Sequence, residues 1–124
     1  CTASGKVQLA FESQDRLLQL LKDRPLRKLT KNTIADLDLL REHLGEVSRQ
    51  GYAVDNEELE DGVCCVAAPV RDYSHRVVAG VGLSGPVSRF SPERVRNDLV
   101  PLVKEAGTKI SQRLGFEISA EGLN

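Results

Sequence analysis

The sequence of 124 residues carries 17 basic and 18 acidic side chains, which gives a formal net charge of −1 at pH 7. This length suffices for one domain with a modest core, and the balanced charge argues against a surface that neutralises nucleic-acid phosphates. No apolar run approaches the roughly 20 residues of a membrane-spanning helix, so we expect a soluble domain without a membrane partner.

The cysteines point to a reducing environment. There are three of them, and Cys64 and Cys65 are adjacent, so they cannot form a disulfide framework. No secretion signal opens the chain, and together these features predict a cytoplasmic protein. The chain contains no methionine, not even at position 1, which indicates a fragment or a processed product.

The first predicted helix begins near Gly5, where the side chain of Thr2 or Ser4 can cap a free backbone N–H group. An ordinary helix cap is the simpler interpretation. The alternative is functional: small residues leave the N–H groups of the first turn open, and a helix N-terminus attracts carboxylate or phosphate.

Two further helices are predicted before the first strand. Ser13 is expected to cap a short helix, and the basic stretch 26–32 is expected to be a solvated connector. Asp36 has the position of an N-cap for a longer helix that ends at Gly51, a typical left-handed C-terminal residue. His43 lies among charged residues of this helix, so we expect it to face solvent, and no second histidine stands at metal-binding spacing.

Five acidic residues crowd the stretch 55–61. A solvated acidic loop is one interpretation. A metal site is a weaker one, because the alternating oxygen donors and the closing glutamate of a calcium loop are missing, and we predict no metal or cofactor. A third interpretation is that Asp55, at the end of a short strand over 52–54, points inward and accepts hydrogen bonds from a ligand.

A β-hairpin is predicted over 62–86, where two runs rich in Val and Ala flank the polar stretch 71–76. If Arg71 faces Arg76 across a four-residue turn, the alternation of side chains defines two faces, one apolar and one nearly bare. The apolar face comprises Cys64, Val66, Ala68, Val70, Val77, Ala79, Val81 and Leu83, and the bare face comprises Cys65, Ala67, Pro69, Val78, Gly80, Gly82 and Ser84.

The bare face has two interpretations. A neighbouring backbone can pack closely there, as it often does against glycine in a strand. Alternatively, the space is a cavity for a small molecule, with Cys65, Gly82 and Ser84 as its floor. These two strands alone leave both interpretations open.

The last predicted element is a helix that starts at Ser91 and Pro92. Pro101 removes one helical hydrogen bond, so a kink is expected over 97–101. The order of elements predicts an α+β fold with an antiparallel sheet flanked by helices. Three strands make a small sheet for this much helix, so we infer that further strands precede Cys1.

Several motifs, in the same order as in the family, resemble the effector-binding domain of IclR-type bacterial transcriptional regulators. They are CTASGK at 1–6, NTI at 32–34, GYAVDNEE at 51–58, GVCCVAAPV at 62–70 and LSGP at 83–86. The resemblance implies a GAF-like (profilin-like) fold. Residues 1–124 would then be a fragment of the effector-binding domain, without its early strands and without the N-terminal winged helix-turn-helix domain.

The resemblance also implies a function and a site. A small organic acid or related metabolite would bind between the sheet and the first helix, in a homodimer or homotetramer that contacts DNA only through the missing N-terminal domain. Many relatives have Ser where Gly82 stands, which would make this pocket roomier. Carried over by position, the ligand-binding residues are Ala3, Ser4, Gly5, Asp55, Glu57, Cys65, Gly82 and Ser84.

Two rival functions remain open at this point. One is an oligomerisation domain whose pocket is filled by its own side chains. The other is a GAF-like redox enzyme that uses Cys64 or Cys65. Adjacent strand residues point to opposite faces, and no histidine or helix N-terminus stands beside them in sequence to lower a thiol pKa, so we predict no catalytic residue.

Overall fold

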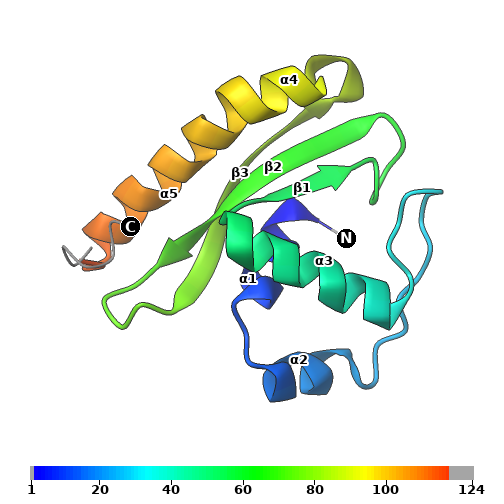
Figure 1. The fold of residues 1–124 in the computed structure, drawn as a ribbon, viewed down its shortest axis with the longest axis horizontal. Coiled ribbons are helices and arrows are strands. Elements are labelled where there is room, and N and C mark those ends of the chain that lie inside the picture. Colours follow the sequence, from blue (N-terminus) through cyan, green and yellow to red (C-terminus); the bar gives the residue numbers. More distant parts are fainter. Residues whose placement is uncertain (1, 118–124) are drawn as a thin grey trace.

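The structure is a computed structural model that describes residues 2–117. A three-stranded antiparallel sheet in the order β1-β2-β3 has helices on both of its faces (Figure 1), which confirms the predicted α+β class. Within residues 2–117, no helix is long and apolar enough to cross a membrane. The elements are α1 (Ala3–Ala10), α2 (Gln14–Leu21), α3 (Leu37–Gln50), β1 (Ala53–Asn56), β2 (Val63–Arg71), β3 (Val77–Pro86), α4 (Pro92–Arg94) and α5 (Val100–Arg113).

Side-chain caps fix where the helices begin. Oxygens of Thr2, Ser13, Asp36 and Ser91 accept hydrogen bonds from backbone N–H groups in the first turns of α1, α2, α3 and α4. Each cap satisfies a donor that the helix itself leaves unpaired. Gly51 ends α3 with a φ of 78°, a conformation that glycine adopts at little cost.

The terminal helix departs from α-helical geometry in the region where a kink was predicted. It passes from α4 through a π-helical turn at Val95–Leu99 into α5. Pro101 lies in the first turn of α5, where its missing N–H is tolerated. The disturbance in the hydrogen-bond ladder is therefore a single π turn.

Each face of the sheet has its own hydrophobic cluster. On one face, α1 and α3 pack on β1 and β2, and on the other, α5 and the π turn pack on β2, as the layers in Figure 1 show. The first cluster consists of Ala3, Val7, Val47, Ala53 and Ala67, and the second of Val66, Ala68, Leu99, Val100 and Val103. The face predicted to be bare is thus the face that α1 and α3 cover.

The pairing register predicted for the hairpin is wrong by two residues. Cys65 lies opposite Ser84, and an irregularity between Val70 and Arg71 places Arg71 opposite Val77 instead of Arg76. A shift of two residues preserves the alternation of side chains. The two predicted faces are therefore correct along most of the hairpin, and the irregularity displaces only the residues next to the turn.

The turn explains the shift. The Asp72 carboxylate accepts hydrogen bonds from the backbone N–H and the hydroxyl of Ser74, at 2.8 and 2.6 Å, and the Asp72 N–H donates to the Arg76 carbonyl at 3.0 Å. His75 has a φ of 66°. This local Asp-centred turn occupies five residues between the strands, one more than the prediction assumed.

Candidate functional site

Three of the predicted site residues form one row across the sheet. Asp55 of β1 lies opposite Cys65 of β2, and Cys65 lies opposite Ser84 of β3. Residues directly opposite one another share a face, so all three lie on the face that α1 and α3 cover. Asp55 is buried, Cys65 is half-buried, and Ser84 is exposed at the edge of the sheet. The row therefore runs from the interior to solvent.

The N-terminal end of α1 lies over this face. Ala3 is buried in the cluster that contains Ala67 and against which Cys65 packs. The cap is Thr2 and not Ser4, because the Gly5 N–H donates to Thr2 Oγ1 at 3.0 Å. By helix geometry, the N–H groups of Ala3 and Ser4 then have no partner within the helix.

Close packing and open space both occur on the bare face. A methyl group added at Gly80 would lie 3.2 Å from the Ser4 Cα and 2.8 Å from Val7 Cγ2, so the backbone of α1 approaches β3 there, as one interpretation predicted. Gly82 and Ser84, further along β3, are exposed. A methyl group at Gly82 would meet the Val66 carbonyl oxygen at 2.7 Å, so the sheet itself disfavours a side chain at this position.

Asp55 is held in place by the loop that follows β1. Its Oδ1 accepts a hydrogen bond from the Glu58 N–H at 2.8 Å, and the residue is only 4% exposed. Burial raises the pKa of the Asp55 carboxyl above its usual 3.8, and the negative charge of Glu58 adds to the increase. The Glu58 N–H and the charge of Lys6 act in the opposite direction without cancelling the effect.

A buried ion pair beside Asp55 was missed by the sequence analysis. Lys6 Nζ lies 2.6 Å from Glu58 Oε1 and donates to Glu58 Oε2 and to the Val54 carbonyl, each at 2.8 Å. Lys6 is 2% exposed and Glu58 is 6% exposed. One signal was present in the sequence: Lys6 follows Ala3 by three residues and so shares its helix face, which is the buried one.

Glu57 lies apart from the row. It follows the end of β1 with a φ of 56°, and its Oε1 accepts a hydrogen bond from the Gly62 N–H at 2.9 Å. This contact closes the loop between β1 and β2. The structure therefore brings together Asp55, Cys65, Gly82, Ser84 and the start of α1, while the Glu57 carboxylate is engaged within its own loop.

The expectation that His43 faces solvent is wrong. The side chain is half-buried, and its Nε2 is buried without a hydrogen-bond partner among residues 2–117. Burial, and then the positive charge of Lys6, lowers the pKa of His43. A neutral imidazole therefore packs from α3 beside the Lys6–Glu58 pair.

The connector over 26–32 is only partly solvated, in contrast to the prediction. Thr30 and Thr33 are buried, and their hydroxyls donate to the carbonyls of Glu57 and Glu58, each at 2.5 Å. Asn32 Nδ2 donates to the Asn56 carbonyl at 2.9 Å. These hydrogen bonds attach the end of the connector to the loop that carries Glu58, so the loop beside Asp55 is fixed from two sides.

Neither strand cysteine is activated. Burial raises the pKa of the Cys64 thiol and of the Cys65 thiol, and the charge of Asp55 raises both further. The protonated thiol is a poor nucleophile. In the described part of the chain, no group of three or more His, Cys, Asp or Glu residues is placed to hold a metal ion.

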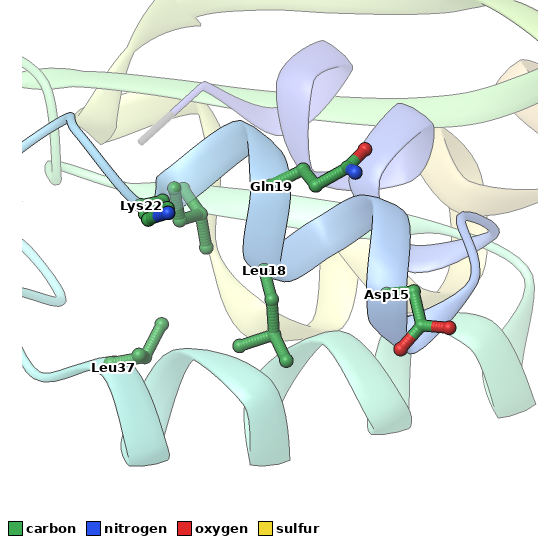
Figure 2. A pocket seen from close by; sticks show the side chains of 6 residues that line it. Asp15, Leu18, Gln19, Lys22 and Leu37 are labelled. Atoms are coloured by element: carbon green, nitrogen blue, oxygen red, sulfur yellow. The ribbon is translucent and has the colours of Figure 1, made fainter.

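A cavity of about 580 Å³ lies away from the row, between α2 and the start of α3. Figure 2 shows Leu18 pointing from α2 toward α3, with Leu37 near the start of α3. No predicted site residue lines this cavity, whose lining comprises Asp15, Leu18, Gln19, Leu21, Lys22 and Leu37. Ser84 borders a separate cavity of about 200 Å³ together with Arg89, Phe90 and Arg94.

Comparison with known proteins identifies the family. The family described as "Bacterial transcriptional regulator IclR C-terminal" matches residues 1–112, and the chain belongs to it. The HTH-type transcriptional regulator KdgR of Escherichia coli K12 is 40% identical over 115 residues, which cover 93% of this chain and 43% of that protein. The chain thus spans less than half the length of this curated relative.

Solved structures agree with this assignment. The C-terminal domain of E. coli KdgR has a TM-score of 0.87 at 40% identity, over 93% of this chain and 70% of that one. IclR of Thermotoga maritima has a TM-score of 0.87 at 40% identity, over 93% and 46%. The inducer-binding domain of the Acinetobacter transcription factor PobR, solved as a double mutant with 3-hydroxybenzoic acid, has a TM-score of 0.84 at 25% identity, over 89% and 63%.

These relatives are named as transcriptional regulators and not as enzymes. Their names agree with the prediction that this domain is not a catalyst, as do the raised thiol pKa values of Cys64 and Cys65.

Proposed function

We propose that this chain is the effector-binding domain of a cytoplasmic, DNA-binding transcriptional regulator, and that it binds a small organic acid or related metabolite. The observation that carries the proposal is the row of Asp55, Cys65 and Ser84 on the face of the sheet that the start of α1 covers. The row combines hydrogen-bonding groups, a buried end and an exposed end, which suits a small polar ligand.

In the proposed complex, a carboxylate accepts hydrogen bonds from the N–H groups of Ala3 and Ser4, which have no partner within α1. The Ser84 hydroxyl and the Asp55 carboxyl contact polar groups of the ligand. Each such hydrogen bond contributes about 1 kcal/mol net, and more with a charged partner, so micromolar affinity is a reasonable expectation. The PobR complex supports an acidic ligand, because a domain of the same family fold holds 3-hydroxybenzoic acid.

The same proposal covers the rest of the regulator. DNA would be bound by a winged helix-turn-helix domain N-terminal to this chain, and the "HTH-type" names of relatives support the presence of such a domain. The complete regulator would be a homodimer or homotetramer. Leu102 and Ile110 of α5 and Leu114, which directly follows this helix, are exposed and are spaced by eight and four residues, which suits a subunit interface. Ligand binding would alter operator binding only if the ligand prefers one subunit arrangement.

A thermal-shift screen of the complete regulator tests the proposal. Acids of two to six carbons, sugar acids and hydroxybenzoates form the panel, and the Ser84→Ala variant and the Gln19→Ala variant are screened beside the wild type. We expect at least one acid to raise Tm in the wild type and in Gln19→Ala, which alters the cavity of Figure 2, and to lose most of its effect in Ser84→Ala. A flat screen would contradict the proposal and favour a ligand-free oligomerisation domain.

A further inference from the structure

The candidate site contains one paired and one unpaired acidic side chain: Glu58 pairs with Lys6, whereas Asp55 forms no ion pair within residues 2–117. The Lys6 ammonium donates hydrogen bonds to Glu58 Oε2 and to the Val54 carbonyl, each at 2.8 Å, and lies 2.6 Å from Glu58 Oε1. Lys6 and Glu58 therefore neutralise each other's charge. Within residues 2–117, Asp55 forms no ion pair, so its charge has no counter-ion of its own.

Asp55 also has an unused oxygen. Its Oδ1 accepts the Glu58 N–H, and among the described residues its Oδ2 takes part in no hydrogen bond. Oδ2 is not one of the buried side-chain atoms that lack a partner, and burial of the carboxyl group is the main cause that raises its pKa. Oδ2, which has no hydrogen bond within residues 2–117, is therefore the oxygen that can carry a proton toward a ligand.

Among residues 2–117, the side chains around Asp55 supply no unpaired positive charge. Lys6 comes from α1 and is matched by Glu58 of the β1–β2 loop. Cys65 faces Asp55 from β2 as a protonated thiol, because its pKa is raised. From α3, His43 approaches the Lys6–Glu58 pair as a neutral imidazole, because its pKa is lowered. A ligand anion in this region would thus meet Asp55 without an unpaired cationic side chain from residues 2–117.

The row is short enough for one small molecule to span it. Neighbouring strands lie about 4.8 Å apart, so the distance from Asp55 across Cys65 to Ser84 is about 10 Å. A ligand carboxylate in contact with Asp55 would place two carboxylates within hydrogen-bonding distance, and such a pair shares a proton.

We propose that a carboxylate effector binds together with one proton. Asp55 takes this proton from solvent, holds it on Oδ2 and donates it in a hydrogen bond to the ligand. This inference rests on the proposed function. Oδ1 continues to accept the Glu58 N–H, so the carboxyl group keeps its position. Asp55 is thereby a specificity-determining residue: its hydrogen bond favours a ligand with an acceptor oxygen over the corresponding amide, which presents a donor in one of the two positions.

Proton uptake predicts a pH dependence with a definite sign. One proton gained on binding makes the apparent Kd increase up to tenfold per pH unit above the pKa of free Asp55. The ligands themselves do not contribute, because carboxylic acids with a pKa of about 4 are ionised throughout the range above about pH 5.5. The affinity of the regulator should therefore fall steadily between mildly acidic and mildly basic conditions.

Calorimetric titration of the complete regulator with glycolate, 2-hydroxybutyrate, gluconate and 3-hydroxybenzoate tests this inference. Each acid is titrated from pH 5.5 to pH 8, in two buffers with different ionisation enthalpies. For the acids that bind, we expect uptake of one proton and an affinity loss that grows with pH. In Asp55→Asn the amide N–H donates permanently and its carbonyl oxygen accepts from Glu58, so binding should be independent of pH, without proton uptake, and at least as tight as wild type at pH 8.

Binding without proton uptake by the wild type would overturn this inference while leaving the proposed function intact. A pH dependence that persists unchanged in Asp55→Asn would also overturn it. If none of the acids binds at any pH, the proposed function fails and this inference fails with it. The buffer comparison uses the wild type alone, so the test does not depend on whether the variant folds.

Discussion

Lys6 and Glu58 connect the two parts of the candidate site. Lys6 lies in α1 directly after the residues that would bind a carboxylate, and Glu58 lies in the loop whose backbone N–H holds Asp55. The buried ion pair therefore sets the position of the helix N-terminus relative to Asp55. Because both charges are buried, removing one of them leaves the other without compensation.

Replacing Lys6 should destabilise the domain strongly. Lys6→Met keeps the aliphatic stem but leaves Glu58 buried without its cation, so we expect the free energy of unfolding to fall by about 3 kcal/mol or more. Urea denaturation measures the change. Lys109→Met is the matched control, since Lys109 pairs with Glu105 on the exposed side of α5 at 3.0 Å, and it should change stability little. Equal losses in the two variants would contradict the role given to the buried pair.

Asp55 should make a pH-dependent contribution to the stability of the ligand-free protein. Its pKa is higher in the folded protein than the usual 3.8, so the folded state binds the proton more tightly than the unfolded state does. The contribution of this group to stability is thus present at low pH and is lost as the pH rises from 3.8 through the folded pKa. Asp55→Asn should be more stable than wild type at pH 7, and this advantage should disappear toward pH 3.8. Thermal unfolding of both proteins at several pH values measures this difference in stability. A difference that does not change with pH would contradict a raised pKa of the Asp55 carboxyl.

The roles of single residues could be predicted from the sequence where these roles depend only on neighbouring residues. Ser13, Asp36 and Ser91 were recognisable as caps because a cap needs only its own first turn. The ion pair could not be predicted, since 52 positions separate Lys6 from Glu58 and a lysine near a helix start is usually solvated.

At the scale of elements, α1 determines the geometry of the site. It contacts β2, β3 and α3, and Gly80 allows its backbone to approach β3 closely. The sequence predicted which residues share a face of the hairpin, because alternation depends only on even or odd spacing. It did not predict the pairing, because the turn at Asp72 has its own side-chain hydrogen bonds.

Adding a methyl group at Gly80 should displace α1. In Gly80→Ala the new carbon would lie 3.2 Å from the Ser4 Cα and 2.8 Å from Val7 Cγ2, and overpacking of this kind costs about 1–3 kcal/mol. We expect lower stability and weaker binding of any acid found in the screen. Gly45→Ala in α3 is the control, since its nearest neighbour is the flexible end of Arg49 at 3.4 Å, and it should be neutral or slightly stabilising. Unchanged acid binding in a folded Gly80→Ala protein would argue against a site at the start of α1.

Two separate places in the described residues are compared as positions for a ligand. The proposed one is the row on the sheet beneath α1, whose end at β3 is exposed, and the alternative is the cavity between α2 and α3 (Figures 1 and 2). The α+β class and the family could be predicted from the order of elements and from motifs such as GYAVDNEE at 51–58. The second cavity could not, because it depends on how α2 packs against the start of α3, which helical periodicity does not specify.

Hydrogen exchange of the complete regulator, with and without the acid that gives the largest shift in Tm, tests the central claim most directly. The N–H groups of Ala3 and Ser4 have no partner within α1 and should exchange quickly in the free protein. We predict that the acid slows exchange in peptides covering 2–7 and 80–86. Slower exchange confined to 15–22 and 37–40 would place the acid in the cavity between α2 and α3 and contradict the account.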